Sequence, residues 1–196
     1  MTRWRVARCL VLTFALACFP ACSKEPKIDW SAPENFFATE KSEEVPDGAR
    51  LEFHSLVDAP AAEVFRALAD AEDYARFVEG VTESELISKA NDIKVTRITQ
   101  TVIGRQSRAE VKWTVHPERL AMEFETLKSD GNYNDGSYRV IPSPNGKRTY
   151  IVSVYHVMEK GAPQNVPIGV LESATREAFG KAARSVKQAA LAMHGH

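Results

Sequence analysis

The sequence predicts an α+β fold in which an antiparallel sheet of about seven strands packs against one long C-terminal helix. Three observations support this prediction. Segments that alternate between apolar and polar residues recur between residues 49 and 158, and each is followed by a turn signal. Two short helical segments interrupt the series after its first member. Residues 170–193 contain no proline and place their apolar residues on one helical face.

The first predicted strand spans residues 49–57, where inward and outward side chains alternate. Pro60 suits the first turn of a helix, because its missing N–H group needs no partner there. Val64 and Leu68 then lie one turn apart on an apolar stripe. A second short helix should follow and end at Gly80. We therefore expect two short helices directly after the first strand.

Six further strands are predicted beyond this helical region, because clusters of Asn, Asp, Gly and Pro divide the chain at short intervals. Their expected ranges are 81–88, 93–103, 107–115, 120–126, 133–141 and 149–158. Regular strands joined by short turns imply an antiparallel meander.

The predicted C-terminal helix is amphipathic along its whole length. Leu171, Phe179 and Val186 fall on one face, whereas acidic and basic residues fall on the other. Glu177 and Lys181 form a favourable pair four residues apart. One side of this helix should therefore cover the sheet.

Four short motifs occur within these elements or between them. They are VDAPAAEVF at residues 57–65, DYARFV at 73–78, PERL at 117–120 and GSYRV at 136–140. With the order of elements, they resemble the START-like or helix-grip (SRPBCC) superfamily, and within it the polyketide cyclase/dehydrase-type and coenzyme Q-binding START-like proteins. The resemblance covers roughly residues 49–192, and the predicted domain spans 49–193. Where many such proteins have a tryptophan in the fifth strand, this chain has Tyr138.

The resemblance implies a helix-grip fold, with a curved sheet and the long helix across its concave face. Side chains do not fill all of the space between such a sheet and helix, and the remainder is an apolar cavity. Proteins of this superfamily bind lipids, isoprenoid quinones or polyketides there. The inward faces of the predicted elements nominate six ligand-binding residues, which are Trp113, Phe124, Tyr138, Leu171, Thr175 and Phe179. Tyr155 and Arg97 are candidates for a polar contact to the ligand.

Other classes of site find little support in the sequence. All three cysteines lie in the first 22 residues, which excludes a thiolate zinc site or a catalytic thiol in the domain. The five histidines show no metal-binding spacing, and no phosphate-binding glycine loop occurs, so we expect no metal and no cofactor. The 25 Lys and Arg residues include Arg3, Arg5 and Arg8, which leaves 22 basic against 26 acidic residues after position 22. Such a domain has no electrostatic reason to bind nucleic acid.

The N-terminus has the pattern of an export signal. Three arginines precede an apolar run of 11 residues, Cys9 to Phe19, which is shorter than the roughly 20 residues needed to span a bilayer. The following residues resemble a bacterial lipobox, with lipid attachment predicted at Cys22. Cys18 preceded by Ala15-Leu16-Ala17 is an alternative, as is plain cleavage after Ala17. Residues 1–22 are thus a predicted signal peptide.

Residues 23–48 are predicted to be a polar tether without regular structure, because prolines and a charged run dominate them. Trp30, Phe36 and Phe37 are too apolar for a pure linker, and we expect them to dock on the domain or at the membrane surface. The predicted location is periplasm-facing, on an outer-membrane lipoprotein, with a soluble periplasmic protein as the alternative.

The function predicted from the sequence is a membrane-tethered, extracytoplasmic binder or carrier of a hydrophobic small molecule or lipid. One alternative is a cyclase/dehydrase-type enzyme using the same cavity, for which His54, Glu110 and Tyr155 are candidate acid/base groups. The other is an interaction module with a filled core. The shape and lining of the cavity distinguish these three.

Overall fold

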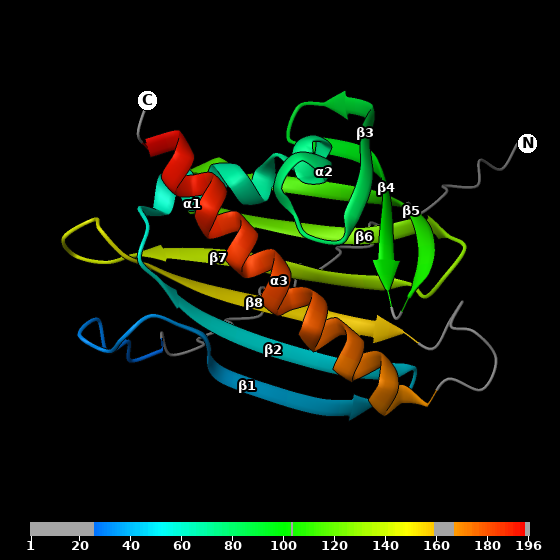
Figure 1. Ribbon diagram of the computed structural model, residues 1–196, viewed down its shortest axis with the longest axis horizontal. Helices are drawn as coiled ribbons and strands as arrows, with labels where there is room; N and C mark the ends of the chain where they lie inside the picture. Colours follow the sequence, from blue (N-terminus) through cyan, green and yellow to red (C-terminus); the bar gives the residue numbers. More distant parts are fainter. Residues whose placement is uncertain (1–25, 103, 159–166, 195–196) are drawn as a thin grey trace, which may run out of the picture.

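The polypeptide folds into one eight-stranded antiparallel sheet with a long helix lying across one face (Figure 1). The computed structural model describes residues 26–102, 104–158 and 167–194, so the predicted signal peptide and Cys22 lie outside the described residues. None of the described helices is both long enough and apolar enough to cross a membrane.

The strands are β1 (Asn35–Val45), β2 (Gly48–Val57), β3 (Val81–Ala90), β4 (Ile93–Val102), β5 (Arg105–His116), β6 (Ala121–Ser129), β7 (Asn134–Pro142) and β8 (Thr149–Met158). The helices are α1 (Ala61–Ala69), α2 (Tyr74–Phe77) and α3 (Ile168–His194), with short 3-10 turns at 71–73 and 117–119. The sheet order is β1-β2-β8-β7-β6-β5-β4-β3. The predicted order of elements along the chain is confirmed, with two short helices after strand β2 and a long terminal helix; the pairing of β2 with β8 was not predicted.

Strand β1 corrects the prediction of an unstructured tether over residues 23–48 and of about seven strands. It pairs antiparallel with β2 as an edge strand, for example Glu40 with Phe53. Its charged residues suit an edge, because charges there discourage pairing with another chain. Phe36 and Phe37 contribute to the core, and Trp30 packs edge-on against Tyr150 at 6.4 Å. The aromatic residues of this segment therefore dock on the domain.

Helix α3 lies closer to one half of the sheet than to the other. It contacts β1, β2 and β8, and it also contacts α1 and α2 (Figure 1). Phe179 stacks on Phe53 of β2, with ring centroids 4.5 Å apart and an interplanar angle of 15°. Gly180 and Ala183 are small enough to let the helix approach, and an added Cβ at Gly180 would lie 3.1 Å from the Phe37 ring. The half formed by β4, β5 and β6 remains farther from the helix.

Gly136 on β7 allows an aromatic side chain to lie against the sheet. It pairs with Phe124 on β6, and a Cβ added at Gly136 would lie 2.0 Å from the Val154 carbonyl oxygen and 2.8 Å from the Phe124 ring. We expect Gly136→Ala to lower the free energy of unfolding by about 1–3 kcal/mol, because backbone and ring must shift. Urea unfolding measures this, with Gly169→Ala as the control because a Cβ there meets nothing within 4 Å. Equal stability of the two variants would contradict the prediction.

Candidate functional site

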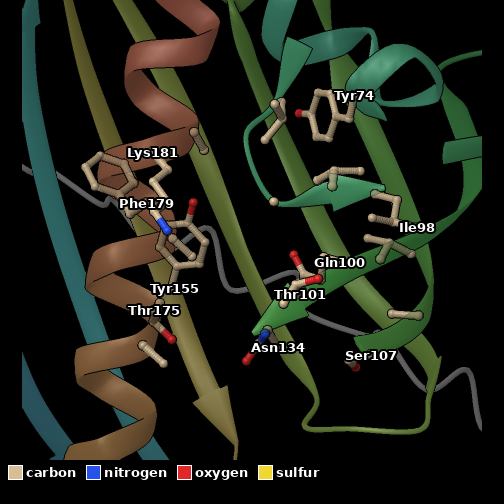
Figure 2. Close-up of a pocket in the computed structure, with 18 of the residues that line it drawn as sticks. Tyr74, Ile98, Gln100, Thr101, Ser107, Asn134, Tyr155, Thr175, Phe179 and Lys181 are labelled. Atoms are coloured by element: carbon tan, nitrogen blue, oxygen red, sulfur yellow. The ribbon is translucent and has the colours of Figure 1, made fainter. Parts of the chain in front are cut away.

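A cavity of about 520 Å³ lies between α3 and the strands β4 to β7. Figure 2 shows Thr175, Phe179 and Lys181 of α3 on one side of it and Ile98 and Gln100 of β4 on the other. Residues 78–81, between α2 and β3, contribute a further wall. Its volume lies within the range of roughly 300–1,000 Å³ that is typical of small-molecule sites. The side chains of the described residues therefore leave this part of the core empty. The interaction-module alternative would require a filled core.

Aromatic side chains form a continuous inner surface of this cavity. Trp113 and Phe124 have ring centroids 5.7 Å apart, and Phe124 lies 5.4 Å from Tyr155. The Trp113 indole N–H donates to the Thr96 hydroxyl at 2.8 Å, which fixes the ring. Ile98 and Val111 add aliphatic surface. Such a lining favours an apolar ligand, since burial of apolar area is worth about 25 cal/mol per Å².

Five of the six predicted ligand-binding residues lie on the cavity wall, namely Trp113, Phe124, Tyr138, Thr175 and Phe179. Leu171 does not, and its predicted position is corrected. It is buried in a separate cluster with Leu51 and Val157, beneath the N-terminal turns of α3. The helix crosses the sheet obliquely, so residues on one helical face lie over different strands (Figure 1).

Two tyrosine hydroxyls meet at the inner end of the cavity. Tyr138 of β7 and Tyr155 of β8 are hydrogen-bonded through their hydroxyl oxygens at 2.5 Å. A third hydroxyl, that of Tyr74, donates to the Leu68 carbonyl at 2.6 Å. Burial raises the pKa of Tyr138 to about 12 and raises the pKa values of Tyr155 and Tyr74 as well. These phenols are therefore neutral hydrogen-bonding groups at physiological pH.

The raised pKa of Tyr138 predicts a loss of stability in alkali. An unfolded phenol has the ordinary pKa of 10.0, so above that pH the unfolded chain gives up a proton that the folded chain keeps until about pH 12. We expect Tyr138 alone to lower the free energy of unfolding through this window by up to about 1.4 kcal/mol per pH unit, and Tyr155 and Tyr74 to add to the slope because their pKa values are raised too. Urea unfolding at several pH values measures the slope. If Tyr138→Phe has the same slope as the wild type, the prediction is wrong.

The charged residues of the lining pair with one another. Lys181 of α3 forms ion pairs with Glu177 at 2.8 Å and with Glu79 of the α2–β3 segment at 3.6 Å. The hydrogen bond with Lys181 lowers the pKa of Glu177, and the same bond raises the pKa of Lys181. Both carboxylates are mostly exposed, at 71% and 64%. They therefore lie at the mouth of the cavity, where water solvates them.

The remaining candidates for polar chemistry lie outside the cavity, apart from Tyr155. His54 is buried against Tyr150 and Glu52, and Tyr150 packs against Trp30. Arg97 and Glu110 form an ion pair with each other at 3.0 Å, and neither belongs to the cavity lining. Within the described residues, no group of three or more His, Cys, Asp or Glu side chains is arranged to hold a metal ion.

Two residues at the inner end of the cavity were not predicted from the sequence as part of the site. Ser153 lies two residues before Tyr155 on β8, and its side chain is fully buried next to the tyrosine pair. Tyr74 of α2 also lines the inner end of the cavity, 5.9 Å from the Trp113 ring. The position of Ser153 could have been inferred from the sequence, because it is a polar residue in the inward-facing stripe of Ile151, Ser153 and Tyr155. Nothing local indicated where Tyr74 would point.

A family model described as "Polyketide cyclase / dehydrase and lipid transport" matches residues 57–184. The matched range begins at the end of β2 and runs into α3, and so contains every residue of the cavity wall. No curated protein matches the chain in a sequence search.

Several solved structures share the fold. A START superfamily protein from Mycobacterium smegmatis superposes with a TM-score of 0.65 at 13% identity, covering 74% of this chain and 98% of that one. The Zhui aromatase/cyclase from a Streptomyces species gives 0.64 at 20% identity, covering 72% and 92%. A STAR-related lipid transfer protein fragment from Xanthomonas axonopodis gives 0.60 at 13%, covering 76% and 90%. At these identities the likeness establishes the fold alone.

Proposed function

Because the chain belongs to the polyketide cyclase/dehydrase and lipid transport family, we propose that it binds and carries a hydrophobic small molecule, such as a lipid or isoprenoid, in the cavity beneath α3. The observation that supports this most directly is the lining. Aromatic side chains line the inner part of a cavity of about 520 Å³, uncharged polar side chains such as Gln100 and Asn134 line other parts, and the charged lining residues are gathered at the mouth. A hydrocarbon chain placed there leaves water without leaving a buried charge unpaired.

Binding is favoured over cyclisation because, among the described residues, neither a histidine nor a carboxylate lines the inner end of the cavity. A cyclase needs a group that accepts a proton near neutral pH. The inner hydroxyls of Tyr138 and Tyr155 have raised pKa values and serve as hydrogen-bonding groups instead. Among the described lining residues, the only carboxylates are Glu79 and Glu177, which pair with Lys181.

Native mass spectrometry and lipid extraction of the protein purified from its own membranes test the carrier function. We expect a hydrophobic molecule to co-purify in a defined stoichiometry and to exchange with an added fluorescent apolar probe, N-phenyl-1-naphthylamine. Protein that is repeatedly empty and has no measurable affinity for the probe would overturn the proposal. Conversion of the bound molecule into a product would favour the enzyme alternative.

We further propose that the protein is exported and anchored by a lipid on Cys22, facing the periplasm from the outer membrane. The support lies in the sequence, in the three early arginines, the short apolar run and the small residue before the cysteine. The segment after Pro26 then leads to β1, so that the anchor would be joined to an edge of the sheet.

Substitution of the two candidate cysteines tests the anchor. We expect Cys22→Ala to abolish incorporation of labelled palmitate and to move the protein from the membrane fraction to the soluble fraction. Cys18→Ala, the matched control, should keep both properties. Loss of label in Cys18→Ala alone would move the anchor to that residue, and an unlabelled wild type would remove the lipoprotein proposal.

A further inference from the structure

A second, smaller cavity of about 40 Å³ adjoins the inner end of the main one. The two cavities share several lining residues, among them Tyr138, Tyr155 and Phe179, so they lie next to each other. The smaller cavity extends toward Leu68 of α1 and Val186 of α3. Its volume is large enough for a water molecule or a small polar substituent, since a cavity needs about 10–15 Å³ to hold one water.

Ser153 gives this small cavity an unusual property. Its side chain is fully buried, and among the described residues its Oγ atom is the one buried side-chain N or O atom without a hydrogen-bond partner. Buried hydroxyls are nearly always paired, because an unmade hydrogen bond leaves the cost of desolvation uncompensated. Ser153 borders the small cavity but presents no accessible surface to it, so the hydroxyl must rotate toward the cavity to meet a partner there.

The neighbouring tyrosines supply further hydrogen-bonding capacity. Tyr138 and Tyr155 share one hydrogen bond, so one of their two hydroxyl protons is used between them and the other is left for a third group. The Tyr74 hydroxyl proton is already used in the hydrogen bond to the Leu68 carbonyl. The inner end of the cavity thus offers one tyrosine proton and one serine hydroxyl in the same small space.

The charge of this space limits what it can hold. Over the described residues, the lining of the small cavity contains no charged side chain. The charged residues of the main cavity, Glu79, Glu177 and Lys181, pair with one another at its mouth. An ionised carboxylate or ammonium at the inner end would be buried without a counter-charge, which is strongly unfavourable. A neutral oxygen would be well satisfied.

We propose that the small cavity is a subsite for a neutral oxygen, a hydroxyl or a carbonyl, at one end of the hydrophobic ligand. The oxygen enters first and contacts Ser153 and the Tyr138–Tyr155 pair, while the apolar remainder lies along the aromatic wall toward the mouth. This inference rests on the proposed function and makes it specific. The ligand class becomes long-chain or polycyclic alcohols and ketones, rather than plain hydrocarbons or fatty acid anions.

Displacement of N-phenyl-1-naphthylamine from the delipidated full chain tests the subsite, with decan-1-ol, undecane and decanoate as competitors. The first two have the same number of non-hydrogen atoms and differ in the hydroxyl. We expect the ratio of decan-1-ol affinity to undecane affinity to fall about tenfold in Ser153→Ala and in the double variant Tyr138→Phe/Tyr155→Phe. A tenfold change in affinity is about what one neutral hydrogen bond contributes. Comparing ratios between variants cancels the different solubilities of the two competitors.

Tyr150→Phe is the matched control, because Tyr150 is on the same strand and bonds to His54 outside the cavity. Its ratio should equal that of the wild type, and thermal unfolding should show that all variants fold. An unchanged ratio in the cavity variants, or tighter binding of decanoate than of decan-1-ol by the wild type, would overturn the subsite while leaving the carrier function intact. A wild type that binds neither probe nor competitors would instead overturn the proposed function.

Discussion

Ala182→Phe should strongly weaken the binding of apolar ligands while leaving the domain folded. Ala182 is on α3, and its side chain lines both the main cavity and the small one. A phenyl ring at this position occupies the space that the ligand needs, and the rigid sheet opposite cannot move away cheaply. We expect the affinity for N-phenyl-1-naphthylamine to fall by at least about tenfold, which corresponds to about 1.4 kcal/mol of binding free energy.

The control for Ala182→Phe is Ala192→Phe, which introduces the same ring at an exposed position of the same helix. It should bind the probe as the wild type does. Urea unfolding separates a blocked cavity from a damaged fold, because a ring that fills empty space leaves the free energy of unfolding unchanged or raises it. Undiminished binding by a folded Ala182→Phe protein would show that the ligand site lies elsewhere.

Phe179→Ala should cause the largest loss of stability of any single truncation in α3. The side chain is 5% exposed, stacks on Phe53 and makes edge contacts with Phe37 at 5.5 Å and Tyr155 at 6.2 Å. Its removal takes away the buried surface that fixes the middle of the helix on the sheet. We expect the free energy of unfolding to fall by about 3–5 kcal/mol, the usual cost of truncating a buried phenylalanine.

Urea unfolding followed by circular dichroism measures this loss, with Phe179→Leu as a milder substitution that keeps most of the apolar volume. Ligand affinity should fall in parallel in Phe179→Ala, because the same ring forms part of the wall of both cavities. A loss below about 1 kcal/mol would mean that α3 is held mainly by its small residues and its contacts with α1.

The succession of strands along the chain and the terminal helix were predictable because their signals are local. Alternation along β2 and β8 and the apolar stripe of α3 each arise within a few residues of one another, so a single sequence contains them. The same alternation indicated that Trp113, Phe124 and Tyr138 face inward. An inward side chain on a curved sheet beneath a helix is a fair candidate for a cavity wall.

Strand β1 was not predicted, because the segment forms a strand through its pairing with β2 and its composition alone does not indicate a strand. Its run of Glu and Lys residues resembles a solvated linker, and an edge strand tolerates such residues on its exposed side. Its order comes from backbone hydrogen bonds to β2 and from Phe37, which packs against Phe53 and Phe179. Those partners are distant in the chain.

The sequence by itself determined the alternation of strands, the amphipathic helix and the side chains that point inward, because these depend on the period of the backbone. Only the tertiary structure decided that Leu171 belongs to a separate cluster and that the Ser153 hydroxyl, close to the Tyr138–Tyr155 pair, has no hydrogen-bond partner among the described residues. The path of α3 across the sheet sets both results. That path depends on the sizes of residues such as Gly180 and Phe37, which meet only after the chain has folded.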